Sequence, residues 1–248
     1  MNKILIGRKI VSDDKNIKIS KNVITFLESG EYVIEYTESV DRQIVFEING
    51  NVRLIETSFD NNLTLDNQYI INSGNLMVIK FYNNDMVMEK IRIDLCGFGS
   101  MVDYKFANIC KGIEKYEINV NHNSKNTVSN ICNKSVALKN SNIKFVINSN
   151  VCKNANKSVL NQSTRIVTMD ECDALIKPNM FIDLDDVEAK HGSIIGSFKE
   201  EDIFYLMSKG ISYSDTLKLL IKGYLFSNID GYFDLRQRVL EIINMYWR

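Results

Sequence analysis

The sequence predicts a mainly β protein, in which a right-handed parallel β-helix (a solenoid) is followed by a small C-terminal α-helical domain. Three observations predict it: short β-type runs between polar turns, an Asn-rich middle region, and a change to helical periodicity near residue 197. The β-rich region with the β-helix core therefore covers residues 1–196, and the helical domain covers residues 197–248.

The predicted strands are runs of four or five residues, rich in β-branched and aromatic side chains. Asn, Ser, Asp and Gly separate the runs, as is typical of turns between strands. They are 32–36, 43–47, 52–55, 77–81, 91–95, 116–120 and 143–147.

The middle region indicates stacked coils. Thirteen of the forty-six residues from Tyr116 to Asn161 are Asn, a residue that tolerates left-handed corners and can hydrogen-bond along a stack. Cys132, Cys152 and Cys172 follow one another at equal intervals, and the length of this interval is typical of solenoid coils. Stacking at that period predicts Cys132 and Cys152 in a structural row inside the solenoid. An antiparallel sandwich fits the same pattern and stays open as an alternative.

Three amphipathic helices are predicted after residue 197. The first has a capping-box pattern at Ser197 and Glu200 and ends at Gly210. The second begins at Ser212 and Asp215 and ends at Gly223. The third begins near Tyr232, and its apolar stripe consists of Leu235, Val239, Ile242 and Tyr246.

Composition excludes several functional classes. Thirty basic against thirty-one acidic residues give no global attraction to nucleic acid or to anionic lipid. The apolar runs are far shorter than the roughly 20 residues of a membrane span, and the N-terminus lacks a signal-peptide pattern, so we expect a cytoplasmic protein. The odd number of cysteines, without a CxxC pair, favours reduced thiols. They are Cys96, Cys110, Cys132, Cys152 and Cys172.

One segment is specific enough to suggest a family. Residues 183–196 read DLDDVEAKHGSIIG, and residues 201–211 continue as EDIFYLMSKGI. This stretch resembles the signature of the SufB/SufD family, scaffold proteins of the SUF iron–sulfur cluster assembly system, in which DDV-x-x-x-HG-x-x-x-G precedes a helix. Lys209 stands where that family usually has Arg, and the strand after Pro178 and the turn at residues 95–100 also resemble the family. A long N-terminal helical region of the family is not recognised, so the chain resembles a compact member.

The resemblance implies a non-catalytic scaffold with a β-helix core. Such proteins pair through their β-helices, here with a SufB-like paralogue or with a second copy, and a transient iron–sulfur cluster forms at the interface. Their helical domain docks SufC, an ABC-type ATPase. The chain contains no GxxxxGK[ST] loop, so the nucleotide would belong to that partner.

Two departures favour the SufD branch. In the SufB branch a Glu follows the signature His, whereas this chain has Gly192. The SufB branch also has a sulfur-accepting Cys on a strand before the His, and an ungapped register places Ser163 of this chain at that position. A minimal homodimeric system stays open.

His191 is the predicted metal ligand, since a neutral imidazole binds iron well and its ordinary pKa is near 6.5. The alternative is a structural His that caps the turn before Gly192. Cys172 is a second, weaker candidate ligand. His122 is expected at a solvated or stacked corner, and Lys190 either faces solvent or steers an anionic sulfur species.

Other functions remain as alternatives. A carbohydrate-active β-helix enzyme is supported by fold analogy alone, and a metal-free protein-interaction solenoid differs from the first hypothesis only in lacking metal. Gly97 and Gly99 lack the third glycine of a dinucleotide loop. Asp183, Asp185 and Asp186 are expected to form a turn rather than a catalytic carboxylate pair. No catalytic residue is predicted.

Overall fold

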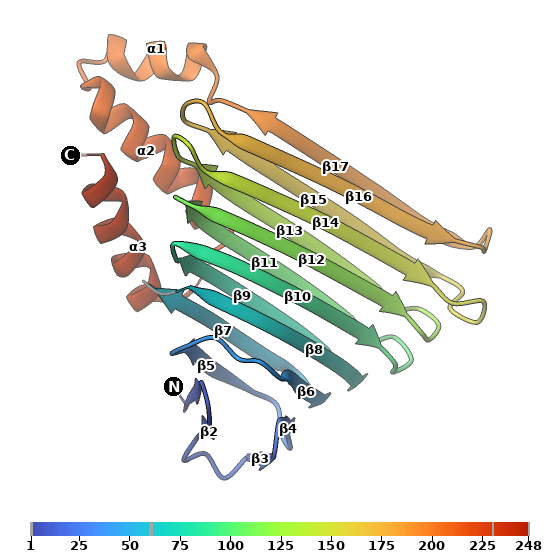
Figure 1. The fold of residues 1–248 in the computed structure, drawn as a ribbon. Coiled ribbons are helices and arrows are strands. Elements are labelled where there is room, and N and C mark those ends of the chain that lie inside the picture. The colour runs from blue at the N-terminus through green and yellow to red at the C-terminus, as the bar shows by residue number, and fades with distance from the viewer. Residues whose placement is uncertain (1, 60–61, 230, 248) are drawn as a thin grey trace.

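The computed structural model describes residues 2–59, 62–229 and 231–247. Within these residues it confirms the prediction of a parallel β-helix with helices at its C-terminal end (Figure 1). Each coil contributes one strand to each of two facing sheets. One sheet has the order β17-β15-β13-β11-β9-β7-β5-β1-β2 and the other β16-β14-β12-β10-β8-β6-β4-β3.

The strands are short at the N-terminal end and are nine to eleven residues long from β8 onward. They are β1 (Asn2–Ile6), β2 (Ile10–Val11), β3 (Ile17–Ser20), β4 (Val23–Phe26), β5 (Gly30–Tyr36), β6 (Gln43–Asn49), β7 (Val52–Phe59), β8 (Leu63–Ser73), β9 (Asn75–Asn83), β10 (Met86–Leu95), β11 (Met101–Cys110), β12 (Ile113–His122), β13 (Val128–Ala137), β14 (Asn142–Val151), β15 (Ser158–Thr168), β16 (Asp173–Ile182) and β17 (Val187–Gly196).

The coil period differs from the one that the cysteine spacing suggested. Gly30 pairs with Val52, Val128 pairs with Val159, and Ser158 pairs with Val187, so each of these coils is longer than the cysteine interval and the offset differs from coil to coil. The predicted cysteine row is therefore wrong. Cys132 lies on β13, whereas Cys152 follows β14 and is exposed, and Cys172 precedes β16.

The Asn residues have the two roles that the sequence suggested. Along one file the amide of Asn179 donates to Asn148, and that of Asn148 donates to Asn119, each at 2.8 Å. At corners, Asn126 and Asn140 have φ values of 58° and 61°, in the left-handed region. Amide ladders and tolerant corners together explain why this region is rich in Asn.

The interior between the sheets contains stacked aromatic rings and a charged network. Phe46 stacks on Tyr69, and Tyr116 stacks on Phe145, each with ring centroids 4.9 Å apart. The fully buried ammonium of Lys80 lies 2.6 Å from a carboxylate oxygen of Glu89 and 3.1 Å from one of Glu56. Burial of these groups is tolerated because both carboxylates contact the one ammonium and accept further hydrogen bonds. The residues that surround the network and supply hydroxyls or an amide are Tyr36, Tyr69, Tyr82 and Asn67.

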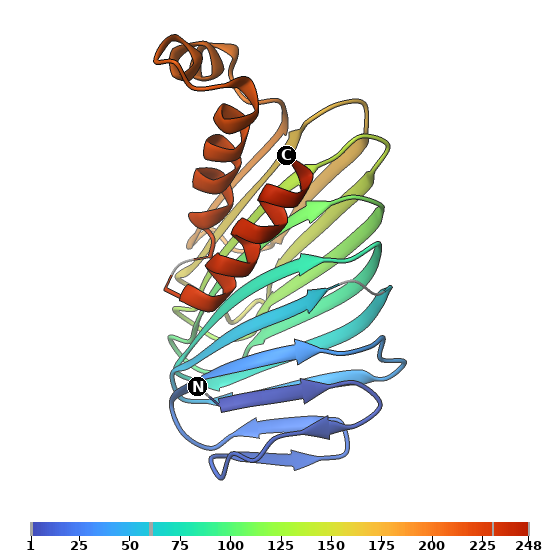
Figure 2. The ribbon, with the colours of Figure 1, turned by 90° about the vertical axis from the view of Figure 1, so that its left-hand side faces the viewer.

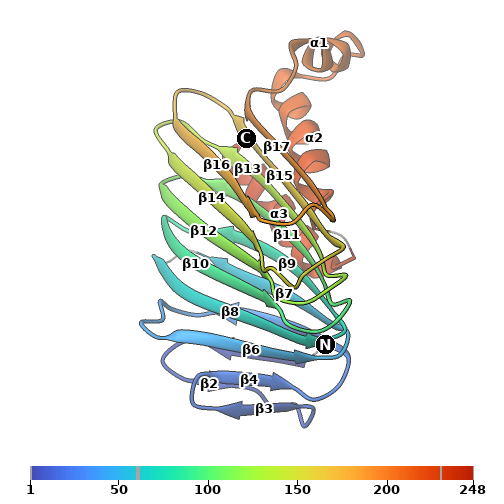
Figure 3. The ribbon, with the colours of Figure 1, turned by 90° about the vertical axis from the view of Figure 1, so that its right-hand side faces the viewer.

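The three helices are α1 (Glu200–Ser208), α2 (Tyr213–Phe226) and α3 (Phe233–Tyr246). Helices α2 and α3 lie along the sheet of β5 to β17, which we call the covered sheet (Figure 2). The sheet of β4 to β16 has no helix over it among the described residues, and we call it the open sheet (Figure 3). None of these helices is long and apolar enough to cross a membrane.

The predicted helix boundaries are partly correct. Ser212 caps α2 by accepting a hydrogen bond from the backbone N–H of Asp215 at 3.1 Å, and Gly210 has a φ of 85°, as expected after a helix end. The capping box is wrong, because Lys199 is the N-cap of α1 and makes no side-chain cap. Helix α2 also continues through Gly223 to Phe226, since its buried face includes Leu225.

The two ends of the solenoid differ. At the N-terminal end, β2 pairs antiparallel with β1, and β3 pairs antiparallel with β4. At the other end, among the described residues, β17 pairs only with β15 and β16 only with β14. The outer edges of β16 and β17 therefore carry unpaired main-chain groups.

Glu114 predicts a pH dependence of stability. Its carboxylate is fully buried inside the solenoid and accepts a hydrogen bond from the Tyr116 hydroxyl at 2.6 Å. Burial raises the pKa of Glu114 from 4.5 to about 7. Its contribution to stability is therefore complete below the unfolded pKa and is lost as the pH rises through the folded pKa.

We expect this loss to be on the order of 3 kcal/mol, and Glu114→Gln to remove it. Urea unfolding of both proteins at several pH values measures it. The wild type should lose stability relative to the variant between about pH 5 and 8. A stability difference that does not change over this interval would show that the carboxyl titrates normally.

Candidate functional site at the open end of the solenoid

The last coil, β16 and β17, forms what we call the open end. No further coil covers it in the described residues, so almost every residue of β17 is exposed. Large apolar side chains are exposed there too. An exposed apolar group next to unpaired strand edges is typical of an interaction surface. The apolar residues are Leu175, Phe181, Ile194 and Ile195.

His191 lies in the middle of β17. It pairs in register with Gln162 on β15, and its side chain is exposed. The alternative role as a cap of the turn before Gly192 is wrong, because β17 continues through Gly196. Within the described residues, the imidazole has no hydrogen-bond or ion-pair partner. Its ring nitrogens are therefore available to a ligand.

Gln162 shows which face His191 occupies. Its amide nitrogen donates to Ser149 Oγ at 2.7 Å and to the Asn179 carbonyl oxygen at 3.3 Å. Ser149 and Asn179 belong to the open sheet, so the Gln162 side chain crosses the interior. Register partners in a parallel sheet point to the same face, and His191 therefore faces the interior at the uncapped end.

A groove of about 310 Å³ lies on the outer side of β13, β15 and β17. Cys132, Ser163 and Gly192 follow one another there in register. The Cys132 thiol donates to Asn228 Oδ1 at 3.3 Å, which ties it to the loop after α2. Lys190 also lines this groove, and its ammonium pairs with Glu188 at 2.5 Å, which favours a surface role for Lys190.

The two predicted ligands are not brought together. Cys172 precedes β16 and packs partly buried against the main core. Burial, with Asp173 and Asp170 as lesser causes, raises the pKa of its thiol and disfavours the thiolate that would bind metal. In the described part of the chain, no three His, Cys, Asp or Glu side chains are grouped to hold a metal ion.

His122 is structural. It is fully buried at the end of β12, where Nδ1 lies 2.7 Å from Thr127 Oγ1 and Nε2 lies 2.9 Å from Ser129 Oγ. Burial lowers the pKa of His122 to about 4, so the ring stays neutral. Of the two expected environments, the stacked corner is correct and the solvated one is wrong.

A second exposed surface lies on the helical domain. Helix α1 has no buried residue, and Phe204 on it is 75% exposed. We call the group on this surface the α1 patch. It consists of Phe204, Tyr205, Met207 and Tyr213.

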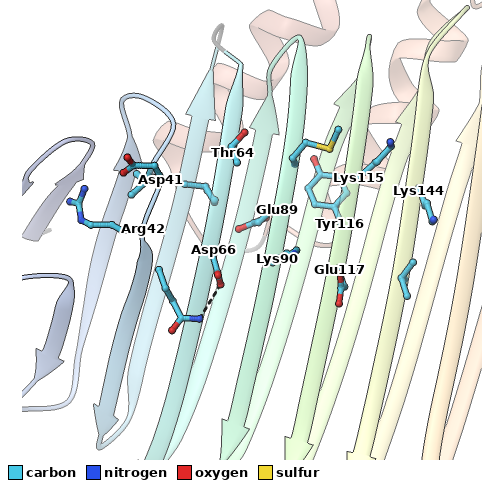
Figure 4. A pocket seen from close by; sticks show the side chains of 15 residues that line it. Asp41, Arg42, Thr64, Asp66, Glu89, Lys90, Lys115, Tyr116, Glu117 and Lys144 are labelled. Atoms are coloured by element: carbon cyan, nitrogen blue, oxygen red, sulfur yellow. Dashed lines mark hydrogen bonds between the residues drawn. The ribbon is translucent and has the colours of Figure 1, made fainter.

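A groove of about 470 Å³ on the open sheet was not expected from the sequence (Figure 4). Lys115 and Lys144 are register partners there, but Asp41, Asp66 and Glu117 line the same groove. Charges of both signs leave it without a clear preference for an anion or a cation.

Gln162 was also missed by the sequence analysis. Only the offset between successive coils, which pairs it with His191, could have revealed its place beside the candidate ligand. That offset is not visible in the local sequence around either residue.

Comparison with known proteins connects this architecture to one family. The family model described as "SUF system FeS cluster assembly, SufBD core domain" matches residues 72–224. The chain is 31% identical over 94 residues to a SufBD family iron–sulfur cluster assembly protein of Pyrococcus horikoshii, covering 29% of this chain and 21% of that protein. It is 36% identical over 69 residues to the iron–sulfur cluster assembly protein SufD of Escherichia coli, covering 27% and 16%. The matches thus span about a fifth or less of these relatives' own lengths.

Proposed function

This chain belongs to the SufBD family of the SUF iron–sulfur cluster assembly system, and on that premise we propose that it is a SufD-like, non-catalytic scaffold subunit. In this proposal the open end pairs with a SufB-like paralogue or with a second copy, and the helical domain binds a SufC-type ABC ATPase. ATP is hydrolysed on that partner, and no nucleotide is bound by this chain.

The difference between the two solenoid ends carries the proposal. At the N-terminal end the stack stops at the short antiparallel strands β2 and β3, of two and four residues, whereas β16 and β17 end it with unpaired edges that are ten residues long. An edge strand binds another chain through main-chain hydrogen bonds, and exposed Phe181 and Ile195 add apolar area. A partner seated there lies against His191.

His191 is the residue that this chain would contribute to a cluster. A neutral imidazole nitrogen is a good ligand for iron, and the cluster is the cargo of the scaffold rather than a resident cofactor. The remaining ligands would come from the partner, since the described residues group no complete set. Gly192 after the His and Ser163 one coil earlier support a SufD-like rather than a SufB-like role.

The α1 patch supports the docking of the ATPase. Its aromatic side chains are exposed on a helix that packs little against the solenoid, which suits a surface covered in a complex. The cysteines of the described chain are free thiols, in keeping with a role in the reducing cytoplasm.

Pairing through the open end predicts that Ile195→Asp disrupts the dimer. A buried carboxylate at the seam would lose its hydration without gaining a partner. Light scattering after size exclusion, on the chain alone and mixed with its SufB-like paralogue, measures the mass. Val11→Asp is the matched control, because Val11 is 52% exposed at the N-terminal end of the solenoid and Ile195 is 46% exposed. A monomeric wild type in both samples, or an Ile195→Asp protein that still pairs, would refute the model.

Docking of the ATPase predicts that Phe204→Asp weakens the complex with the SufC-type partner by at least about tenfold, as expected for an aromatic residue at the centre of an interface. Binding is measured by titration under reducing conditions. Phe98→Asp serves as the control, since Phe98 is 73% exposed in the turn after β10. Equal losses in both variants would argue against the α1 patch.

For the cluster, we expect His191→Ala to keep the thermal midpoint of the wild type and to lower the cluster yield. Anaerobic reconstitution of the partnered complex with iron and sulfide, followed by absorbance, measures the yield. Lys190→Ala, which changes the neighbouring outward residue, should not lower it, and Cys172→Ser tests the weaker candidate. A wild-type complex that binds no cluster would favour the metal-free solenoid.

A further inference from the structure

Gln162 has an unusual hydrogen-bonding state. It is only 4% exposed, and both hydrogens of its amide have acceptors, at Ser149 Oγ and at the Asn179 carbonyl. Its carbonyl oxygen Oε1 is buried and has no partner. Buried acceptors in folded proteins are nearly always paired, so this oxygen calls for a donor.

The orientation of the amide is fixed by its neighbours. The main-chain carbonyl of Asn179 can only accept a hydrogen bond, so the amide nitrogen of Gln162 must face it. An exchange of the nitrogen and oxygen positions would place two acceptors against each other. Oε1 therefore points away from the open sheet strand that carries Asn179.

The register leaves two candidate donors on this face. On the inner face of the covered sheet, Gln162 lies between Ile131 on β13 and His191 on β17. Ile131 has no polar side-chain group. The hydroxyl of Thr164, two residues along β15, accepts from Asn133 at 2.9 Å, and its own hydrogen is the competing donor. The imidazole of His191 carries an N–H and is otherwise unpartnered within the described residues.

We propose that Gln162 is a positioning residue for His191: Oε1 accepts the Nδ1–H of the imidazole and thereby leaves the lone pair on Nε2. Nε2 is the ring nitrogen farther from the backbone, and so the one that can reach a ligand at the seam. A hydrogen bond at one ring nitrogen fixes which nitrogen binds metal. The inference rests on the proposed function only for the identity of that ligand.

Nuclear magnetic resonance on the metal-free chain tests the hydrogen bond directly. The chain has two histidines, so two-bond ¹H–¹⁵N correlation spectra at alkaline pH report each ring separately. A neutral imidazole in water favours the Nε2–H form. We expect His191 to be mainly Nδ1–H in the wild type and mainly Nε2–H in Gln162→Met, which removes the acceptor.

His122 is the internal control, because its ring is held by Thr127 and Ser129 and should give unchanged signals in every folded variant. A wild-type His191 in the Nε2–H form overturns the inference even where Gln162→Met does not fold, and so does a tautomer that is the same in wild type and Gln162→Met. Cluster retention in the partnered complex should fall about 10- to 100-fold in Gln162→Met. A changed tautomer with unchanged retention would instead refute the role of His191 in the proposed function.

Discussion

The main-chain ladder between successive coils is the constraint on which the rest of the structure depends. Each inner strand is paired with the strand of the coil before and with that of the coil after, and from β9 onward the covered sheet keeps these pairs in register over eight to ten residues. Because side chains alternate between faces, a slip of one residue would exchange the interior and the surface of a whole strand. The ladder therefore fixes the stacked aromatic rings, the amide files and the place of His191 together.

The interior shows how strictly that register is kept. Lys80 lies on β9 and its carboxylate partners lie on β7 and β10, so the buried charges come from both sheets and from neighbouring coils. Displacement of any one of these strands would leave a charge unpaired in a medium of low polarity, at a cost of several kcal/mol. Such a network adds little net stability, but it penalises every other alignment of these coils.

Much of this architecture could be predicted from residues close together in the chain. The β-branched runs marked strands, Ser212 marked the start of α2, and Gly210 marked the end of α1, because each depends on local geometry. The coil length could not be predicted. The even spacing of the cysteines suggested a solenoid for a wrong reason, since coil length is set by strands and corners whose size varies from coil to coil.

The candidate site, too, could be predicted only in part from residues close together in the chain. The signature stretch pointed to His191, but its exposure depends on β17 being the last strand of its sheet, and its register partner Gln162 lies a full coil earlier in the chain. No local pattern encodes either fact. The roles of Cys132 and Cys172 were likewise decided by contacts with Asn228 and with the core, which only the folded chain brings together.

The short antiparallel strands at one end have a consequence for higher-order growth. A stack that offered long parallel edge strands at both ends could add copies head to tail without limit and would form fibres. At the N-terminal end, β2 and β3 are only two and four residues long and offer another copy little main chain to pair with. If copies pair through β16 and β17, as proposed, the assembly therefore ends at two chains.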